Sequence, residues 1–338
     1  MKKGLVAFTL SLLIAITTGS QAITETTERW KLGHLRAQGS AIDNDLQKFV
    51  SQIIEKTNGK FSFDVYAGGK LGDYSLVQER VSFGEVELFV GPFGTSIDRR
   101  LMLPTIPYLV NNWQQAKQLF YQGSPLFKMM ARFLLDQNIK LIGGWPVYFG
   151  GIGLVEKPDQ PGNPDIEKEM IIRTPPIKSF ELATKQLGYT PYPITWTYAK
   201  MGLKTGMVAG IIGGGAEGYA GLKGLINYYI PVKDHFEYWF FYMNLDAWNG
   251  LSDSEKEDFL TTAKEMEDRR YQVAEEMENR SLAELKKQGI TIVELTEKEL
   301  GVMREKVQKS VWPQLEKDIG PEFTKIISIA TGTSQTKQ

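Results

Sequence analysis

The pattern of apolar and polar positions in the first part of the chain predicts alternating strands and helices. Residues 30–35 read as a strand, and apolar residues recur at helical spacing over 42–56. Residues 61–66 alternate as a strand, 76–83 repeat as a helix, and 86–90 form another strand-like run. Strands and helices in this order are typical of a mostly parallel sheet with helices over its faces. The pattern therefore predicts an α/β fold.

The middle of the chain predicts a second α/β segment. Residues 141–145 favour a strand, and the glycines at 150–153 indicate a turn into a new segment. The loop at 159–164 is rich in proline, glycine and asparagine, which makes it a candidate passage between two lobes. A shorter alternation runs over 170–231. A chain of 338 residues is also long enough for two lobes.

A long charged helix is predicted near the C-terminus. Residues 253–288 carry scattered apolar positions among many charges, and Ser252 with Glu255 forms a capping box at their start. Thr296 and Glu299 form a second capping box. A helix of this composition could cover a core, brace two lobes or pair with a second copy of the chain. A homodimer through this helix therefore stays open.

The first residues of the chain match a secretory signal peptide. Two lysines precede an apolar run over 4–16, and small residues then lead to Ala22. The run is too short for a membrane-spanning helix, and no later stretch is long and apolar enough to cross a bilayer. We therefore predict a signal peptide over 1–22, cleavage near Ala22 and a periplasmic location. At the other end, residues 331–338 predict a disordered tail.

Composition excludes several classes of chemistry. The chain has no cysteine, which excludes disulfides, thiolate metal sites and cysteine nucleophiles. Its formal net charge is −1 and its basic residues are dispersed, so nothing points to nucleic acid. His34 and His235 are its two histidines, and no Gly-x-Ser-x-Gly segment accompanies them. We therefore predict no catalytic residues, no metal and no cofactor, and a binding protein rather than an enzyme.

Arg173 follows an apolar run over 170–172 and precedes Thr174-Pro175-Pro176. The run reads as a buried strand, and the prolines cannot continue it because proline has no N–H for a sheet ladder. The arginine therefore lies where a core strand ends in a cleft. Its guanidinium best matches a carboxylate or another oxyanion. The alternative is that Arg173 pairs with one of the chain's own acids.

The glycine-rich run at 213–218 fits G-x-G-x-x-G after a strand-like segment. A dinucleotide site has an acidic residue closing the next strand about 20 residues further on. Asp234 lies 16 residues beyond the run, but Pro231 interrupts the strand that it would end. An exported nicotinamide-dependent oxidoreductase is therefore kept as the alternative function. Without Cβ atoms, Gly213 and Gly214 could instead bring backbone N–H groups close to an anion.

Aromatic residues near turns are the candidates for an apolar cleft wall. Phe149 precedes Gly150, and Trp196 follows Pro193 in a short segment without strong periodicity. Trp145 ends the preceding strand-like run. Ligand sites are mainly apolar, with a few placed polar groups that fix the ligand. We therefore predict that Trp145, Phe149 and Trp196 contact the ligand.

Short motifs follow one another in a specific order along nearly all of the chain. They are Lys56-Thr57-Asn58-Gly59-Lys60, Leu71-Gly72, Leu103-Pro104, Pro107-Tyr108-Leu109-Val110, Ile172-Arg173-Thr174-Pro175, Leu187-Gly188, Pro191-Tyr192-Pro193, Leu203-Lys204-Thr205-Gly206 and Lys287-Gln288-Gly289-Ile290. Their order and spacing resemble the DctP-type periplasmic substrate-binding proteins of tripartite ATP-independent periplasmic (TRAP) transporters. The resemblance implies a small organic acid as ligand and TRAP permease subunits as partners. A ligand-sensing module for a membrane receptor would look the same in sequence.

The resemblance also implies the architecture. It is a two-lobed periplasmic-binding-protein fold, similar to type II, with crossing strands and a long bracing helix. Residues 23–150 and about 239–278 would form lobe 1, and residues 151–238 and about 279–330 would form lobe 2. An organic acid would be captured between the lobes without chemistry and delivered to the permease.

The same resemblance implies the ligand contacts. In the family, the arginine of the strand before the proline clamps the ligand carboxylate bidentately, and that position is Arg173. An aromatic residue that stacks over the ligand falls at Trp196, and a further contact falls at Gly213, next to Gly214. The first lobe would contribute Arg36, Tyr74, Pro92 and Phe93.

Two departures from the family pattern bear on the ligand. Gly213 stands where many members have a polar side chain, and Gly150 and Gly151 stand where some members have a second arginine. Glycines leave room, and the surrounding residues are aromatic. We therefore predict a bulkier or more apolar monoacid than a small dicarboxylate, with Arg173 as the only strong polar anchor.

Overall fold

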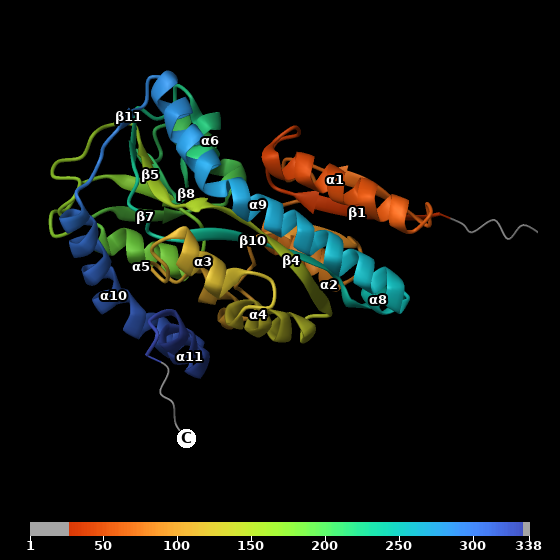
Figure 1. Ribbon diagram of the computed structural model, residues 1–338. Helices are drawn as coiled ribbons and strands as arrows, with labels where there is room; N and C mark the ends of the chain where they lie inside the picture. Colours follow the sequence, from red (N-terminus) through yellow and green to blue (C-terminus); the bar gives the residue numbers. More distant parts are fainter. Residues whose placement is uncertain (1–26, 334–338) are drawn as a thin grey trace, which may run out of the picture.

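The computed structural model describes residues 27–333 and folds them into two mixed β-sheets flanked by helices (Figure 1). The first sheet has the order β2-β1-β3-β10-β4, with β1 (Glu28–His34), β2 (Phe61–Tyr66), β3 (Leu88–Gly91), β4 (Ile139–Phe149) and β10 (Phe236–Asn244). The second has the order β11-β9-β5-β8-β6-β7, with β5 (Gly151–Leu154), β6 (Ile171–Thr174), β7 (Thr190–Pro193), β8 (Gly210–Gly214), β9 (Tyr228–Ile230) and β11 (Thr291–Ile292). Each sheet is the base of one lobe, as predicted. The predicted signal peptide over 1–22 and residues 334–338 of the predicted tail lie outside the described residues.

Helices cover both sheets and connect them. In chain order they are α1 (Ala41–Lys56), α2 (Tyr74–Ser82), the 3-10 helix η1 (Arg99–Thr105), α3 (Trp113–Phe120), α4 (Pro125–Leu135), α5 (Lys178–Gln186), α6 (Trp196–Lys204), α7 (Ala216–Tyr219), the 3-10 helix η2 (Ala220–Leu222), α8 (Leu245–Asn249), α9 (Asp253–Lys287), α10 (Glu297–Ile319) and α11 (Pro321–Ala330). The helices predicted over 42–56, 76–83 and 253–288 are confirmed as α1, α2 and α9, with ends that differ by one or two residues.

The first lobe follows the apolar pattern of its sequence. β1 pairs in parallel with β2 and β3. Burial of Ile42, Leu46, Phe49 and Ile53 places the apolar stripe of α1 against this sheet. β10 arrives from far along the chain and runs antiparallel to both β3 and β4. The sheet is therefore mixed, and only its first three strands form the predicted parallel run.

Two of the connections between the lobes run through neighbouring strands, from β4 to β5 and from β9 to β10. Only Gly150 separates β4 from β5, and its N–H donates to the carbonyl oxygen of His235 at 2.9 Å. On the return path between β9 and β10, the Lys233 N–H donates to the carbonyl oxygen of Gly150 at 3.0 Å. The predicted turn at 150–153 is wrong, because the chain continues as buried strand β5. The predicted passage at 159–164 is also wrong, since the strands on either side of it share one sheet.

Helix α9 lies along both lobes (Figure 1). It begins at the predicted capping box, in which Ser252 and Glu255 satisfy each other's backbone N–H groups. It packs against α1 and β4 of the first lobe and against α7 and β11 of the second. Arg270 on this helix is 1% exposed and donates to two carbonyl oxygens of β4 and to the carboxylate of Glu217. The predicted bracing helix is confirmed.

The last two helices fold back across the molecule. α10 packs against α5 of the second lobe and η1 of the first, and α11 packs against η1, α3 and α4. The Trp312 indole N–H donates to the carbonyl oxygen of Pro107 at 2.9 Å. This segment therefore joins the lobes, whereas the prediction grouped all of 279–330 with lobe 2. No helix within residues 27–333 has the length and apolar character needed to span a membrane.

Candidate ligand-binding site

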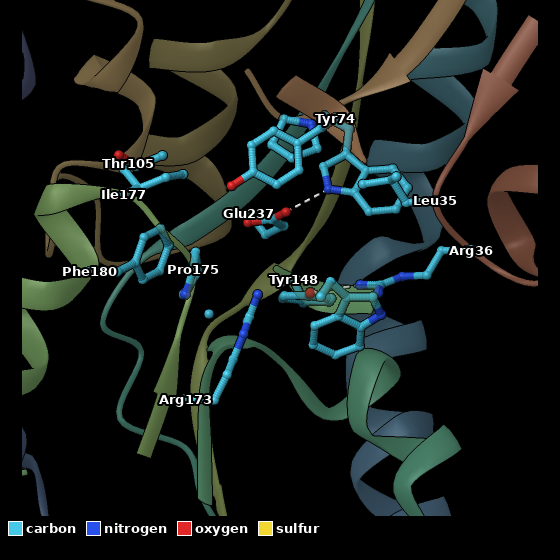
Figure 2. Close-up of a pocket in the computed structure, with 14 residues that line it drawn as sticks. Leu35, Arg36, Tyr74, Thr105, Tyr148, Arg173, Pro175, Ile177, Phe180 and Glu237 are labelled. Carbon is cyan, nitrogen blue, oxygen red and sulfur yellow. Dashed lines mark hydrogen bonds between the residues drawn. The ribbon is translucent and has the colours of Figure 1, made fainter. Parts of the chain in front are cut away.

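A cavity of about 60 Å³ lies between the lobes, beside the crossing strands (Figure 2). It is lined by Leu35, Arg36, Tyr74, Pro92, Thr105, Tyr148, Arg173, Pro175, Ile177, Phe180, Trp196, Gly213, Glu237 and Trp239. An outer chamber of about 450 Å³ shares four of these residues, Leu35, Arg36, Tyr74 and Trp196. The outer chamber has the size of a small-molecule site, and the inner cavity has mainly apolar walls with a few polar groups.

Arg173 reaches the inner cavity from β6 and is 2% exposed. Its Nε donates to the carbonyl oxygen of Ile194 at 2.8 Å and its Nη1 to that of Ile212 at 3.2 Å. Within residues 27–333 it forms no ion pair, and its Nη2 makes no hydrogen bond. Burial lowers the pKa of Arg173 to about 10, so the group is charged at neutral pH. The predicted alternative, a pair with one of the chain's own acids, is therefore absent from the described residues.

The indole of Trp196, at the start of α6, contacts two guanidinium groups. Cζ of Arg173 lies 5.5 Å from the ring centroid, and Cζ of Arg36 lies 5.2 Å from it. Tyr219 stacks on the same indole at 6.3 Å with an interplanar angle of 12°. Arg36 follows β1 of the first lobe and donates to the Tyr148 hydroxyl at 2.8 Å. The Arg36–Trp196 contact therefore joins the two lobes beside the cavity.

Glu237 faces the cavity from β10 of the first lobe. Its Oε1 accepts from the Trp239 indole N–H at 2.5 Å, and its Oε2 lies 3.4 Å from Nε2 of His235. Nδ1 of His235 lies 2.8 Å from Oδ2 of Asp234. Burial lowers the pKa of His235, but the carboxylates of Asp234 and Glu237 outweigh burial and raise it to about 10. At neutral pH the imidazole is therefore a cation held by two carboxylates.

Two hydroxyl groups complete the polar part of the lining. Tyr74 is 6% exposed, and its hydroxyl has no hydrogen-bond partner among the described residues. Burial raises the pKa of Tyr74 above its usual value, so this hydroxyl is a neutral donor at neutral pH. The Thr105 hydroxyl is 2.7 Å from that of Ser179. The site thus offers two guanidinium groups with free donors, those of Arg173 and Arg36, together with one carboxylate and one unpaired phenol.

Residues 32–318 match the DctP family, described as bacterial extracellular solute-binding protein, family 7. The chain belongs to this family. The resemblance that the motifs predicted is confirmed, and with it a solute-binding role. No group of three or more His, Cys, Asp or Glu in the described part of the chain could hold a metal ion.

Solved structures with the same fold are TRAP periplasmic solute-binding proteins. One from Haemophilus influenzae with bound L-gulonate is 20% identical, with a TM-score of 0.83 over 91% of this chain and 100% of that chain. One from Desulfovibrio salexigens with bound orotic acid is 18% identical, with a TM-score of 0.83 over 90% and 98%. The sugar acid binding protein from Advenella mimigardefordensis in complex with galactonate is 18% identical, with a TM-score of 0.82 over 91% and 99%. These likenesses show the two-lobed fold.

In this solute-binding protein, most of the predicted site residues come together. Arg36, Tyr74, Pro92, Arg173, Trp196 and Gly213 line the cavity, and Phe93, Trp145, Phe149 and Gly214 do not. Phe93 instead stacks on Phe240, with ring centroids 4.1 Å apart. The Trp145 ring packs against the Arg270 guanidinium at 4.0 Å, and its indole N–H donates to Asp45. Both rings are part of the core that supports the cavity.

Phe149 and the glycines also have packing roles. Phe149 packs edge-on against Trp113 at 5.7 Å. A Cβ on Gly213 would lie 2.4 Å from Cγ of Pro175, and one on Gly150 would lie 2.2 Å from the His235 ring. The prediction that these glycines leave room for ligand is therefore wrong, because side chains of the protein fill the space.

Sequence reasoning missed Glu237, the acidic group of the cavity. It is the single charged residue of β10, a strand that otherwise reads Phe-Tyr-Trp-Phe-Phe-Tyr-Met-Asn. An isolated charge in an apolar strand is the signal that revealed Arg173, and it could have revealed Glu237. Trp239, two residues further along, shares the same face of the strand and holds the carboxylate.

Proposed function

We propose that this protein binds an organic acid between its lobes, with the ligand carboxylate on Arg173, and delivers it to the membrane permease of a TRAP transporter. The observation that carries the proposal is a buried guanidinium without an acidic partner in the described residues. A buried charge is costly unless it is paired and hydrogen-bonded. A ligand carboxylate supplies both, and Trp196 supplies an apolar surface beside it.

The related structures support this choice of ligand. L-gulonate, orotic acid and galactonate are all carboxylic acids. Capture outside the cytoplasm also agrees with the family, whose members are extracellular solute-binding proteins. We accordingly place this protein in the periplasm, exported by a signal peptide over 1–22 that is cleaved near Ala22.

The nicotinamide alternative is not favoured by the packing of the glycine run. Gly213 packs against Pro175, Gly214 against Tyr219, and Gly215 against Tyr148. A bound pyrophosphate would need the space that these side chains fill. We therefore propose binding without catalysis and without a cofactor.

Loss of the Arg173 guanidinium tests the proposal. The wild type and Arg173→Gln are titrated by calorimetry with the acid that co-purifies with the wild type, as identified by native mass spectrometry, or failing that with a panel of organic acids. We expect Arg173→Gln to lose at least about 100-fold in affinity, the order seen when one partner of a buried charge pair is removed. Arg29→Gln, on the exposed side of β1, serves as the control and should bind normally. Near-normal affinity of Arg173→Gln would contradict the proposal.

A further inference from the structure

A second cleft, of about 280 Å³, lies at the crossing strands, outside the ligand cavity. Its first wall belongs to the first lobe and includes Asn111, Trp113 and Phe149. Its second wall belongs to the second lobe and includes Tyr229 of β9 and Glu294, two residues beyond β11. We call this space the back cleft. Because both lobes line it, its width depends on how the lobes sit relative to each other.

The strand orders place the ligand cavity and the back cleft on opposite sides of the crossing strands. The chain crosses from β4 to β5 and from β9 to β10. The ligand cavity receives Arg36 from the end of β1, which lies beyond β3, and Arg173 from β6, which lies beyond β8. The back cleft receives Phe149 from β4, the edge strand of the first sheet, and Tyr229 from β9, on the other side of β5. The crossing strands therefore separate the two spaces.

The lobes are closed over the ligand cavity in this structure. The Thr105 hydroxyl of η1 lies 2.7 Å from the Ser179 hydroxyl of α5, and the Arg36 guanidinium lies against the Trp196 indole. Both contacts join the first lobe to the second. A rotation about the crossing strands that separates these pairs opens the ligand cavity. Because the back cleft lies on the other side of the same strands, this rotation moves its two walls toward each other.

Hydrogen bonds hold both walls of the back cleft in place. The Glu278 carboxylate of α9 accepts from the Trp113 indole N–H at 3.1 Å and from the Phe149 N–H at 2.9 Å. In the second lobe, the Val293 N–H donates to the carbonyl oxygen of Tyr229 at 2.8 Å. Each wall is therefore fixed to its own lobe, and the width of the back cleft follows the rotation of the lobes.

We propose that the back cleft narrows as the ligand cavity opens, and that the side chains in it set the ligand affinity without touching the ligand. The inference rests on the proposed function, because it takes the cavity between the lobes as the ligand site. It goes further by naming a second place that controls closure. Ligand affinity is proportional to the fraction of molecules in the form that binds. A side chain that keeps the back cleft wide therefore raises the affinity.

Spin labels on two pairs of cysteines test the opposite motions, and labelling is specific because the chain has no cysteine of its own. Gln38→Cys with Lys204→Cys labels exposed positions on the two lobes beside the outer chamber. Asn111→Cys with Glu294→Cys labels the two walls of the back cleft. When the acid identified by the titrations above is added, pulsed electron paramagnetic resonance should show the first distance shorten and the second lengthen. A back-cleft distance that stays constant or shortens while the first distance shortens would overturn the inference.

A bulky side chain in the back cleft tests its control of closure without any ligand. Glu294→Trp fits the cleft of the closed form and collides with the opposite wall when the lobes separate. In ligand-free protein labelled at residues 38 and 204, we expect it to shift the distance toward the shorter, closed value. In calorimetry it should raise the affinity for the acid about tenfold, because the closed fraction increases. Asn111→Trp adds the same bulk from the other wall and should have the same effects.

Two controls separate bulk in the back cleft from other effects of the substitution. Glu294→Gln removes the charge without adding bulk, and Glu276→Trp places the same ring at an exposed position of α9 outside the cleft. Both should match the wild type. Unchanged distances in both Glu294→Trp and Asn111→Trp would overturn the inference. If no acid binds the wild type, the proposed function fails, whereas the ligand-free distances still decide the role of the back cleft.

Discussion

Gly213 shows, at the scale of a single residue, how a missing side chain can serve packing. Its φ is +84°, in the left-handed region that favours glycine, and a Cβ would meet the Pro175 ring. Pro175 in turn lines the cavity beside Arg173. The close approach of Gly213 therefore sets the position of a cavity wall.

Gly213→Ala should destabilise the fold and weaken ligand binding. The new methyl group forces either an unfavourable backbone conformation or a shift of Pro175. Either change lowers the free energy of unfolding by about 1–3 kcal/mol. Urea unfolding measures the loss, and calorimetry measures the affinity. Gly221→Ala is the control for the unfolding measurement, because its Cβ would meet no atom within 4 Å and its φ is not positive. A change within about 0.5 kcal/mol for both variants would refute the packing role of Gly213.

The role of a single residue could be predicted from sequence where its side chain differs in character from the residues around it. Arg173 stood out because a permanent charge ends an apolar strand before a proline. Trp145 and Phe149 could not be placed, because the face of a strand that meets a cavity depends on which element packs there. Trp145 meets Arg270, which lies far along the chain.

At the scale of an element, helix α9 carries an unusual buried acid. Glu267 is fully buried and accepts hydrogen bonds from the Tyr238 hydroxyl at 2.7 Å and from the Gln122 N–H at 3.2 Å. Burial raises the pKa of Glu267 from 4.5 to about 7. Between these pH values the folded protein holds a proton that the unfolded chain has released. The stability that this group contributes is therefore present at pH below 4.5 and is lost as the pH rises through about 7.

Glu267→Gln should remove this pH dependence. Relative to the wild type, the variant should gain on the order of 2 kcal/mol in unfolding free energy between about pH 5 and pH 8. Urea unfolding of both proteins across that range measures the difference. Glu265→Gln, an exposed position on the same helix, should differ from the wild type by a constant amount. A constant difference for Glu267→Gln would show that its carboxyl titrates normally in the folded protein.

Helices and strands could be predicted where the pattern that specifies them lies within the segment itself. Helix α1 repeats its apolar residues at helical spacing, and both capping boxes lie where the sequence places them. Strand β5 has the sequence of a turn, because two of its four residues are glycines. Its pairing with β8 and β9 overrides this weak local preference. The antiparallel placement of β10 likewise depends on partners far away in sequence.

At the scale of the whole molecule, a cation–π contact beside the cavity joins the two lobes directly. Arg36 belongs to the first lobe and the Trp196 indole to the second, with Cζ of Arg36 5.2 Å from the ring centroid. A contact that joins the lobes stabilises the arrangement in which they are close, and any ligand bound between them adds to it. The division into two lobes could be predicted from the family resemblance. The contact between Arg36 and Trp196 could be seen only in the structure.

Arg36→Gln should therefore shift the molecule toward more separated lobes. A cation–π contact contributes about 0.5–2 kcal/mol, so we expect a larger mean radius of gyration in small-angle scattering without ligand and an affinity lower by up to about 30-fold. The control is Lys140→Gln, which removes a cation–π contact with Trp248 at 4.9 Å inside the first lobe. That variant should leave both readouts unchanged. An unchanged radius of gyration for Arg36→Gln, even with weaker binding, would show that Arg36 acts on the ligand alone and does not hold the lobes together.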